Sequence, residues 1–272
     1  MEIVKIEREI REWYENYVRG FHKDDFQYME NINLKYDHTE RVVIESRGIG
    51  ISLGIEVRDT SLLLISALLH DIGRYGQMKK HGTFNDKISE NHAKLGVEVI
   101  RESGILNKIY PEDQKLIETV VLNHNKKSLP KSMNERERLF CQIVRDADKL
   151  DILRILAEHY NSPKDRQNRS IEIDLDSSDT TVSPEIISSL NSGEVVAYTE
   201  LKNITELKLL QIGWVYDINY LWTYQLLENR GFIEEIVKTV PKKTELTEIC
   251  DRAVSFLKKR ALEAKESGLR GR

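Results

Sequence analysis

The chain has 272 residues, of which 40% are hydrophobic and 32% are charged, and it carries a formal net charge of -4. These values are typical of a folded globular protein with a sizeable core, and the acidic balance argues against broad electrostatic binding to nucleic acid. The two cysteines, Cys141 and Cys250, are too few and too far apart for a disulfide framework or a cysteine metal site, which favours a reducing cytoplasm.

The first predicted element is an amphipathic helix at the N-terminus. The stretch MEIVKIEREIREWYENY is charged throughout, which is unlike a signal peptide. Its apolar side chains recur on one helical face at Ile3, Ile6, Ile10, Trp13 and Tyr17. The longest apolar run of the chain, around Leu62–Leu69, is far shorter than a membrane span. We therefore expect a cytoplasmic protein that does not enter a membrane.

Helical periodicity continues from the N-terminal region to about residue 159. The predicted helices cover residues 38–49, a segment that ends near 73, and residues 89–100, 111–124 and 134–159. Gly73 is the expected C-cap of the helix that precedes it, because glycine is favoured at helix C-termini. Ser89 is the expected N-cap of the next helix, and Pro111 suits the first turn of the one after. Residues 81–86 are predicted to form a loop.

The character of the sequence changes near residue 160. The segment of about residues 161–200 is polar, contains Pro163 and Pro184, and is predicted to be a loop or excursion. Residues 206–231 are predicted to form one strong helix, and a last helix is expected to follow Thr244 as its N-cap. The aromatic side chains of the strong helix are Trp214, Tyr216, Tyr220, Trp222 and Tyr224. This pattern favours packing in the core. The alternative is that the aromatic stripe closes over a substrate.

The chain shows no internal repeat and no convincing strand, which predicts an all-α fold. The alternating stretch SIEIDLD is too short to change this prediction. We expect a single helical domain over residues 1–272. Its core would cover about residues 25–160, followed by the polar excursion of about 161–200 and by C-terminal helices over about 201–265.

Four histidines and two aspartates lie at helix ends or on apolar helix faces. They are His38, His70, Asp71, His92, His124 and Asp148. Asp148 stands out because Val144, Ile152 and Ile155 share its face, and a carboxylate in an apolar stripe is costly unless a cation stabilises it. His159 has no comparable acidic companion and is left out of this set.

Each of these residues also has a reading that needs no metal. A single histidine on an apolar face is usually a core residue with its hydrogen bonds satisfied, and Asp148 could cap a helix or pair with Arg145. Their combination is what favours a metal site. Imidazole and carboxylate together suit Zn, Mn and Fe, whereas calcium prefers oxygen ligands alone.

The order of these residues resembles that of the HD-domain superfamily of metal-dependent phosphohydrolases, which is named for an adjacent His-Asp pair. HDIGRYGQ and RDADKLD are the most recognisable segments, and TFNDKISENHAKLG is similar to a segment of a bacterial subgroup of uncharacterised HD proteins. The resemblance covers about Tyr36–Leu156. The later stretch IGWVYDINYLWTYQLL is similar, less specifically, to the C-terminal helices of that subgroup.

The resemblance implies an all-α, HD-domain-like helical bundle with a central metal site and additional C-terminal helices. One ion would be held by His38, His70, Asp71 and Asp148, and a second by His92 and His124 with Asp71 as the bridge. The stretch ADKLD matches the family's pattern, which selects Asp148 rather than Asp146 or Asp151. The cofactors would be two divalent transition-metal ions of unspecified identity, drawn from Fe, Mn, Zn, Ni and Co.

The resemblance also implies the reaction. The chain would be a metal-dependent hydrolase that cleaves a phosphate ester or anhydride of a nucleotide or related small molecule through a metal-bound hydroxide. Arg74 and Lys149 are the candidates for binding the substrate phosphate, so the predicted catalytic residues are Asp71, Arg74 and Lys149. Either cation could instead be a solvated surface charge. Lys126 and Lys127, just past His124, could attract an anion to the mouth of the site, but we expect them to be solvated loop charges.

Two alternatives stay open. The first is a di-iron oxygenase, because a few HD proteins use the same six ligands for oxidative cleavage. The second is a non-catalytic nucleotide-binding or regulatory HD module, against which the intact ligand set counts. The ligands do not decide between hydrolysis and oxygenation, and the size of the phosphohydrolase group favours hydrolysis. The sequence shows no nucleotide-binding glycine loop, and it specifies neither the substrate nor the oligomeric state.

Overall fold

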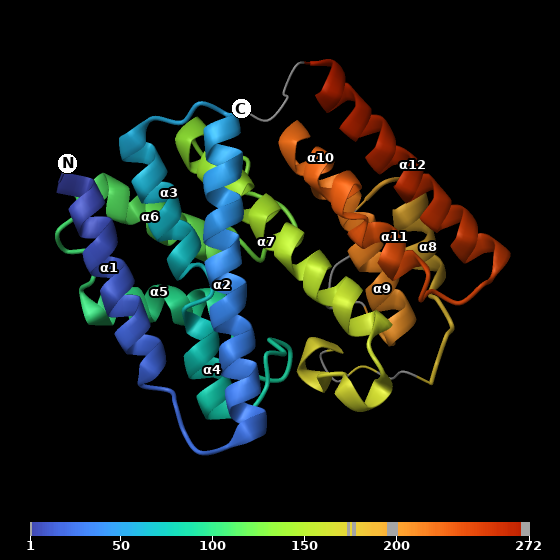
Figure 1. Ribbon diagram of the computed structural model, residues 1–272, viewed down its shortest axis with the longest axis horizontal. Coiled ribbons are helices and arrows are strands. Elements are labelled where there is room, and N and C mark those ends of the chain that lie inside the picture. The colour runs from blue at the N-terminus through green and yellow to red at the C-terminus, as the bar shows by residue number, and fades with distance from the viewer. Residues whose placement is uncertain (1, 173–174, 176–177, 195–200, 268–272) are drawn as a thin grey trace. The chain divides into compact units, whose positions relative to one another are not determined.

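The computed structural model describes residues 2–172, 175, 178–194 and 201–267 (Figure 1). The chain divides into two compact units, Met1–Asp148 and Lys149–Arg272. The division falls inside the long helix α7 (Glu135–Asn161), so this one helix contributes to both units. The single domain expected from the sequence stays a prediction, because a compact unit is not by itself an independently folding domain.

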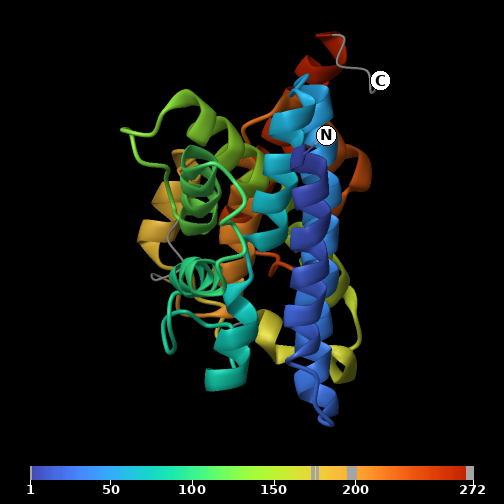
Figure 2. The ribbon, with the colours of Figure 1, turned by 90° about the vertical axis from the view of Figure 1, so that its left-hand side faces the viewer.

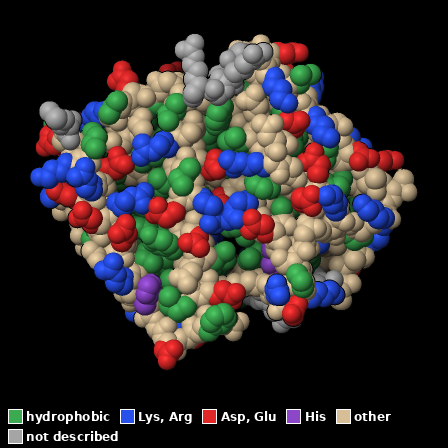
Figure 3. Space-filling model, viewed as in Figure 1, with side chains coloured by type: hydrophobic (Ala, Val, Ile, Leu, Met, Phe, Trp, Pro, Cys, Tyr) green, Lys and Arg blue, Asp and Glu red, His purple; other side chains and the backbone are tan. Residues whose placement is uncertain are grey.

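The described residues form helices joined by turns and loops, and none of them belongs to a β-strand, which confirms the all-α fold. Among these residues, no helix combines the length and the apolar composition that crossing a membrane requires. Lys and Arg side chains alternate with Asp and Glu side chains over the face that Figure 3 shows. This mixture agrees with the small net charge of the chain.

The first unit is built around a largely buried helix. Its helices are α1 (Glu2–Arg19), α2 (Phe26–Ser52), α3 (Val57–Leu69), α4 (Gly73–His81), α5 (His92–Ser103), α6 (Pro111–Asn123) and the first part of α7. Residues 61–69 of α3 are all buried, and this helix packs against α1, α2 and α6. Figures 1 and 2 show α1 and α2 running alongside each other while α5 crosses them.

The second unit carries the additional C-terminal helices. They are α8 (Pro184–Asn191), α9 (Ile204–Gly213), α10 (Leu221–Arg230), α11 (Phe232–Val237) and α12 (Thr244–Glu266), with short 3-10 turns at Lys164–Arg166, Arg169–Glu172 and Trp214–Asp217. The predicted polar excursion is therefore partly helical. Helix α8 lies within it and buries Ile186 and Leu190, an apolar pair at helical spacing inside an otherwise polar stretch.

The single helix predicted over residues 206–231 is wrong. The chain leaves helical geometry at Ile218 and Tyr220, both of which are extended. The hydroxyl of Tyr224 lies 3.0 Å from the main-chain oxygen of Val215 and 3.1 Å from that of Ile218, so carbonyls freed by the break find a donor. The aromatic residues therefore do not form one stripe. Trp214 and Tyr224 are buried, whereas the other three are half-buried.

Several helix boundaries correct the predicted ones. Helix α2 begins at Phe26, well before the predicted start, because Asp25 caps it by accepting a hydrogen bond from the Tyr28 amide at 3.0 Å. Helix α5 is capped by Asn91 rather than Ser89, whose hydroxyl donates to the main-chain oxygen of Asn85. Thr244 is the first residue of α12 rather than its cap. The predicted limits of α6 and α7 hold to within two residues.

Gly73 does not cap the third helix. Helix α3 ends at Leu69, a turn follows, and Gly73 is the first residue of α4. A Cβ at this position would lie 2.2 Å from the main-chain oxygen of His92 and 2.6 Å from the amide nitrogen of Gly96. Glycine is therefore required because the start of α4 presses against the start of α5, and not because a helix ends there.

Gly73→Ala is expected to destabilise the protein by about 1–3 kcal/mol or more, because the main chains of α4 and α5 must separate. Urea unfolding followed by circular dichroism measures the change. Gly76→Ala in the same helix is the control. A Cβ at position 76 would meet no other atom within 4 Å, so this substitution is expected to stabilise the protein by about 0.4–1 kcal/mol. Equal stabilities of the two variants would contradict the close contact.

Candidate metal centre

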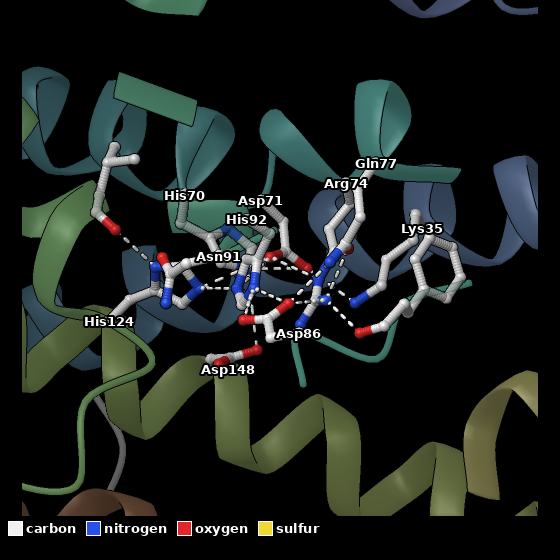
Figure 4. Close-up of polar contacts among 12 residues, drawn as sticks. Lys35, His70, Asp71, Arg74, Gln77, Asp86, Asn91, His92, His124 and Asp148 are labelled. Carbon is white, nitrogen blue, oxygen red and sulfur yellow. Dashed lines mark hydrogen bonds and ion pairs between the residues drawn. The ribbon is translucent and has the colours of Figure 1, made fainter. Parts of the chain in front are cut away.

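Six side chains from five parts of the first unit come together. His38 lies in α2, His70 and Asp71 form the turn after α3, His92 opens α5, His124 follows α6, and Asp148 lies in α7. Five of them are buried and the Asp148 side chain is 15% exposed. Figure 4 shows five of these six residues directed toward one point. The structure therefore brings together the whole predicted set, although the residues are spread over more than a hundred positions of the sequence.

Asp71 occupies the middle of the cluster. Its Oδ2 lies 3.7 Å from Nε2 of His38 and 3.8 Å from Nε2 of His70. Its Oδ1 lies 3.3 Å from Nε2 of His92 and 3.5 Å from Nε2 of His124. The two oxygens of one carboxylate thus face two different pairs of imidazoles.

The cluster has two halves that share Asp71. In the first half, Oδ1 of Asp148 lies 3.1 Å from Nε2 of His38 and 3.7 Å from Nε2 of His70. In the second half, the Nε2 atoms of His92 and His124 are 3.0 Å apart. The ligand atoms of His38, His70 and Asp71 lie within 4.8 Å of one another, and so do those of Asp71, His92 and His124.

Two of the histidines are oriented by the same kind of hydrogen bond. His70 and His124 directly follow the last residues of α3 and α6, and their Nδ1 atoms lie 2.7 Å from the main-chain oxygens of Ala67 and Val121. The last carbonyls of a helix have no partner within the helix, so they are free to accept these bonds. A carbonyl only accepts, so Nδ1 carries the proton and the lone pair of Nε2 faces the cluster.

The cluster leaves polar atoms that a metal would satisfy. Nε2 of His70 and Oδ1 of Asp71 are buried and make no hydrogen bond within the described parts of the chain. Such atoms are costly, since they have lost water and gained no partner. Imidazole nitrogens and carboxylate oxygens are the donors that Zn, Mn and Fe accept. The residues present therefore fit divalent transition-metal ions.

A comparison with protein families agrees with this geometry. The family model described as HD domain matches residues 36–153, a range that contains all six clustered residues. Residues 36–153 of the chain therefore match an HD domain. HD domains bind divalent metals and are generally metal-dependent hydrolases. No curated protein and no solved structure matches the chain.

The charges inside the HD domain suit metal ligands. Burial alone would raise the pKa of Asp71, but the charges of Lys35 and Arg74 hold this pKa well below its usual range. Burial likewise opposes ionisation of Asp148, and the adjacent imidazoles of His38 and His70 overcome it and lower the pKa. Both aspartates are thus carboxylates.

His92 is held in the neutral form. Burial, assisted by the positive charge of Arg74, lowers the pKa of His92 to about 3. Burial opposes ionisation of its partner Asp86, but hydrogen bonds from His92 and Gln77 and the charge of Arg74 together outweigh it and bring the pKa of Asp86 to about 2. A neutral imidazole is the form that binds a metal ion, so His92 needs no deprotonation at neutral pH.

Lys35 is a residue of the site that the sequence reasoning missed. Its Nζ lies 2.7 Å from Oδ2 of Asp71, and its side chain is 15% exposed. Lys35 precedes His38 by three residues, so the two share a face of α2. This spacing could have indicated from the sequence that Lys35 lies near the site, but the chain has many other lysines and the spacing alone does not single out this one.

Arg74 lies beside the cluster in the first turn of α4. Its Nε is 3.5 Å from Oδ1 of Asp71. Its Nη1 donates to Oε1 of Gln77 at 2.8 Å, to the main-chain oxygen of Phe84 at 2.6 Å and to Oδ1 of Asp86 at 3.0 Å. The expected helix end at Gly73 is therefore not what orients this side chain. Its role as a phosphate ligand stays a prediction.

The other residues weighed in the sequence have different surroundings. Lys149 belongs to the second unit, where its Nζ lies 2.8 Å from Oδ2 of Asp217, and its predicted phosphate role stays a prediction. Arg145 donates to the main-chain oxygens of His124 and Lys126, which fixes the chain after α6. His159 does have an acidic companion, contrary to the sequence reasoning. Oε1 of Glu172 lies 3.0 Å from its Nε2.

Proposed function

We propose that this HD-domain protein is a metal-dependent phosphohydrolase that acts on a phosphate ester or anhydride of a nucleotide or related small molecule. The observation that carries the proposal is the position of Asp71, whose two oxygens face two separate imidazole pairs. When two divalent ions are bound, they supply a hydroxide nucleophile at neutral pH and offset the charge of the phosphoryl group.

The side chains beside Asp71 support an anionic substrate. Lys35 and Arg74 both approach its carboxylate, and both are partly exposed, at 15% and 16%. Nη1 of Arg74 is occupied by the chain itself, whereas its Nε is buried and makes no hydrogen bond within the described residues. We assign Lys35 and the Nε edge of Arg74 to oxygens of the substrate phosphate. Lys149 is the weaker candidate because it belongs to the second unit and pairs there with Asp217, whereas Lys35 and Arg74 both contact Asp71 of the cluster.

The thiols of the chain do not compete as nucleophiles. Burial raises the pKa of Cys141 to about 12 and that of Cys250 to about 11. A thiol attacks as the thiolate, so neither residue is reactive at neutral pH. We therefore assign water as the attacking group, and Asp71 and Asp148 would hold the centre that activates it.

The test is a substrate screen combined with metal analysis. The purified protein is loaded with Mn²⁺ and incubated without oxygen against nucleotides, dinucleotides and phosphate monoesters, and release of phosphate or cleaved product is measured. Metal-dependent turnover without oxygen is the expected result. Turnover that requires iron and oxygen would instead assign an oxygenase. Tight nucleotide binding without turnover would assign a regulatory module.

Arg74→Ala is expected to lower kcat/KM for phosphorylated substrates about ten- to a hundredfold, because a charge-assisted hydrogen bond contributes about 1.5–3 kcal/mol. Metal is kept in excess, so that any weaker metal binding is not what the assay reports. Arg74→Lys should recover only part of the loss, since an ammonium lacks the planar fork.

The control for Arg74 is Arg101→Ala, which removes an exposed arginine of the same unit that pairs with Glu118. This variant should keep the wild-type kcat/KM. Wild-type kinetics in Arg74→Ala would remove Arg74 from the substrate site. Metal lost even at high concentration would instead make the role of Arg74 structural.

A further inference from the structure

His92 is held in a different way from the two histidines that follow helices. It is the first residue of α5, so no preceding helical turn offers a carbonyl to its ring. Its Nδ1 instead lies 2.7 Å from Oδ2 and 3.0 Å from Oδ1 of Asp86. His70 and His124 depend on the main chain of their own helices, whereas His92 depends on one side chain from the loop before α5.

Asp86 is itself fixed by two side chains of α4. Gln77 Nε2 donates to Oδ1 of Asp86 at 2.8 Å, and Arg74 Nη1 donates to the same oxygen at 3.0 Å, which leaves Oδ2 for His92. Gln77 is fully buried, and its Nε2 also lies 2.9 Å from the Ser89 hydroxyl and 2.9 Å from the main-chain oxygen of Glu90. Figure 4 shows Arg74, Gln77 and Asp86 lying together beside His92. We call these three residues the clamp.

The clamp contacts the two halves of the centre unequally. Asp86 contacts His92, which belongs to the second half, and the contacts that orient His70 in the first half come from the end of α3. A carboxylate behind a ligand histidine fixes its tautomer and ring orientation and makes the other nitrogen a stronger donor. Removing this carboxylate should therefore weaken one half of the centre.

We propose that the clamp sets the metal affinity of the His92–His124 half independently of the His38–His70 half, by acting through Asp86 on His92. Asp86, Gln77 and the Nη1 group of Arg74 are positioning residues in this role. The inference rests on the metal centre and does not depend on which reaction the centre catalyses. Asp86 is the residue to test, because Arg74 also approaches Asp71, which both halves share.

Asp86→Asn keeps the size of the side chain and removes its charge. Substitution of such a partner typically costs 10–100-fold in metal affinity. In equilibrium dialysis against graded Co²⁺, we expect one of two bound equivalents to weaken about 10–100-fold while the other is unchanged. The visible absorption of bound Co²⁺ in the variant should differ from that of the wild type only over the concentration range in which the weaker equivalent binds.

The matched control is Glu172→Gln. It removes the carboxylate from His159, a pair of the same kind at 3.0 Å in the second unit. Co²⁺ binding should stay at the wild-type level. Gln77→Met, which removes one donor to Asp86, should weaken the same equivalent as Asp86→Asn but by less, and the melting temperature of each metal-free variant checks the fold.

The proposal is overturned if Asp86→Asn binds both equivalents as the wild type does, or if both weaken together. It is also overturned if the wild type binds a single equivalent, because there would be no second half to weaken. These outcomes are separate from a failure of the proposed hydrolysis, which would appear as two bound ions without turnover of any phosphorylated substrate.

Discussion

Asp71→Asn is expected to lower kcat/KM for hydrolysis by more than about a hundredfold. Substituting a residue that only orients a ligand typically causes a smaller loss. The asparagine has one oxygen and no charge, so neither imidazole pair keeps the carboxylate that faces it. Lys35 and Arg74 would then stand beside the centre without their shared anion, which further disfavours a cation. Metal analysis after dialysis should show that both equivalents are lost, and the kinetics should follow.

Asp113→Asn is the matched control for Asp71→Asn. Asp113 is also a buried aspartate between two cations, because Arg58 lies 2.5 Å and Arg136 2.8 Å from its two oxygens. Its loss should lower stability and leave metal content unchanged. An Asp71→Asn protein that keeps both ions at wild-type affinity would remove Asp71 from the centre.

Removal of metal is expected to lower the melting temperature by about 5–10 °C. The ligands come from α2, the turn after α3, α5, α6 and α7, so the ions bind the folded chain and not the unfolded one. At a metal concentration of 100 times Kd, this linkage contributes about 2.7 kcal/mol, and for a chain of this size each kcal/mol shifts the melting temperature by about 2–4 °C.

The measurement is a thermal scan before and after chelation, with metal analysis of both samples. Asp71→Asn should show a much smaller change, because its site is already impaired before the chelator is added. A wild-type melting temperature that stays the same after verified removal of metal would show that the ions do not join these helices.

The residues that lie on helices were the easiest to place from the sequence. Asp148 interrupts an apolar face that repeats at helical spacing, and such a conflict with burial is visible without a structure. The structure confirms the all-α fold and brings the six predicted side chains together, and the family model of the HD domain matches residues 36–153. That these side chains hold metal stays a prediction.

The residues that depend on tertiary contact were not predictable in the same way. Asp86 lies in a loop without periodicity, so nothing in the sequence connects it to Gln77 or to His92. Gly73 was predicted to end a helix. The actual reason for a glycine here is the close approach of α5, a segment some twenty residues away, which the local sequence does not reveal. The break at Ile218 was hidden because apolar and aromatic residues continue through it.

The helix end that each histidine occupies has an electrostatic consequence. Aligned peptide dipoles place roughly half an elementary charge at each end of a helix, negative at the C-terminus and positive at the N-terminus. His70 and His124 stand at C-termini, which attract a cation, whereas His92 stands at an N-terminus, which repels one. In the second half, the end of α6 therefore attracts a cation and the end of α5 repels it. The negative charge of Asp86 offsets the repulsion by α5. The main chain thus makes the two halves electrostatically unequal, although each presents two imidazoles.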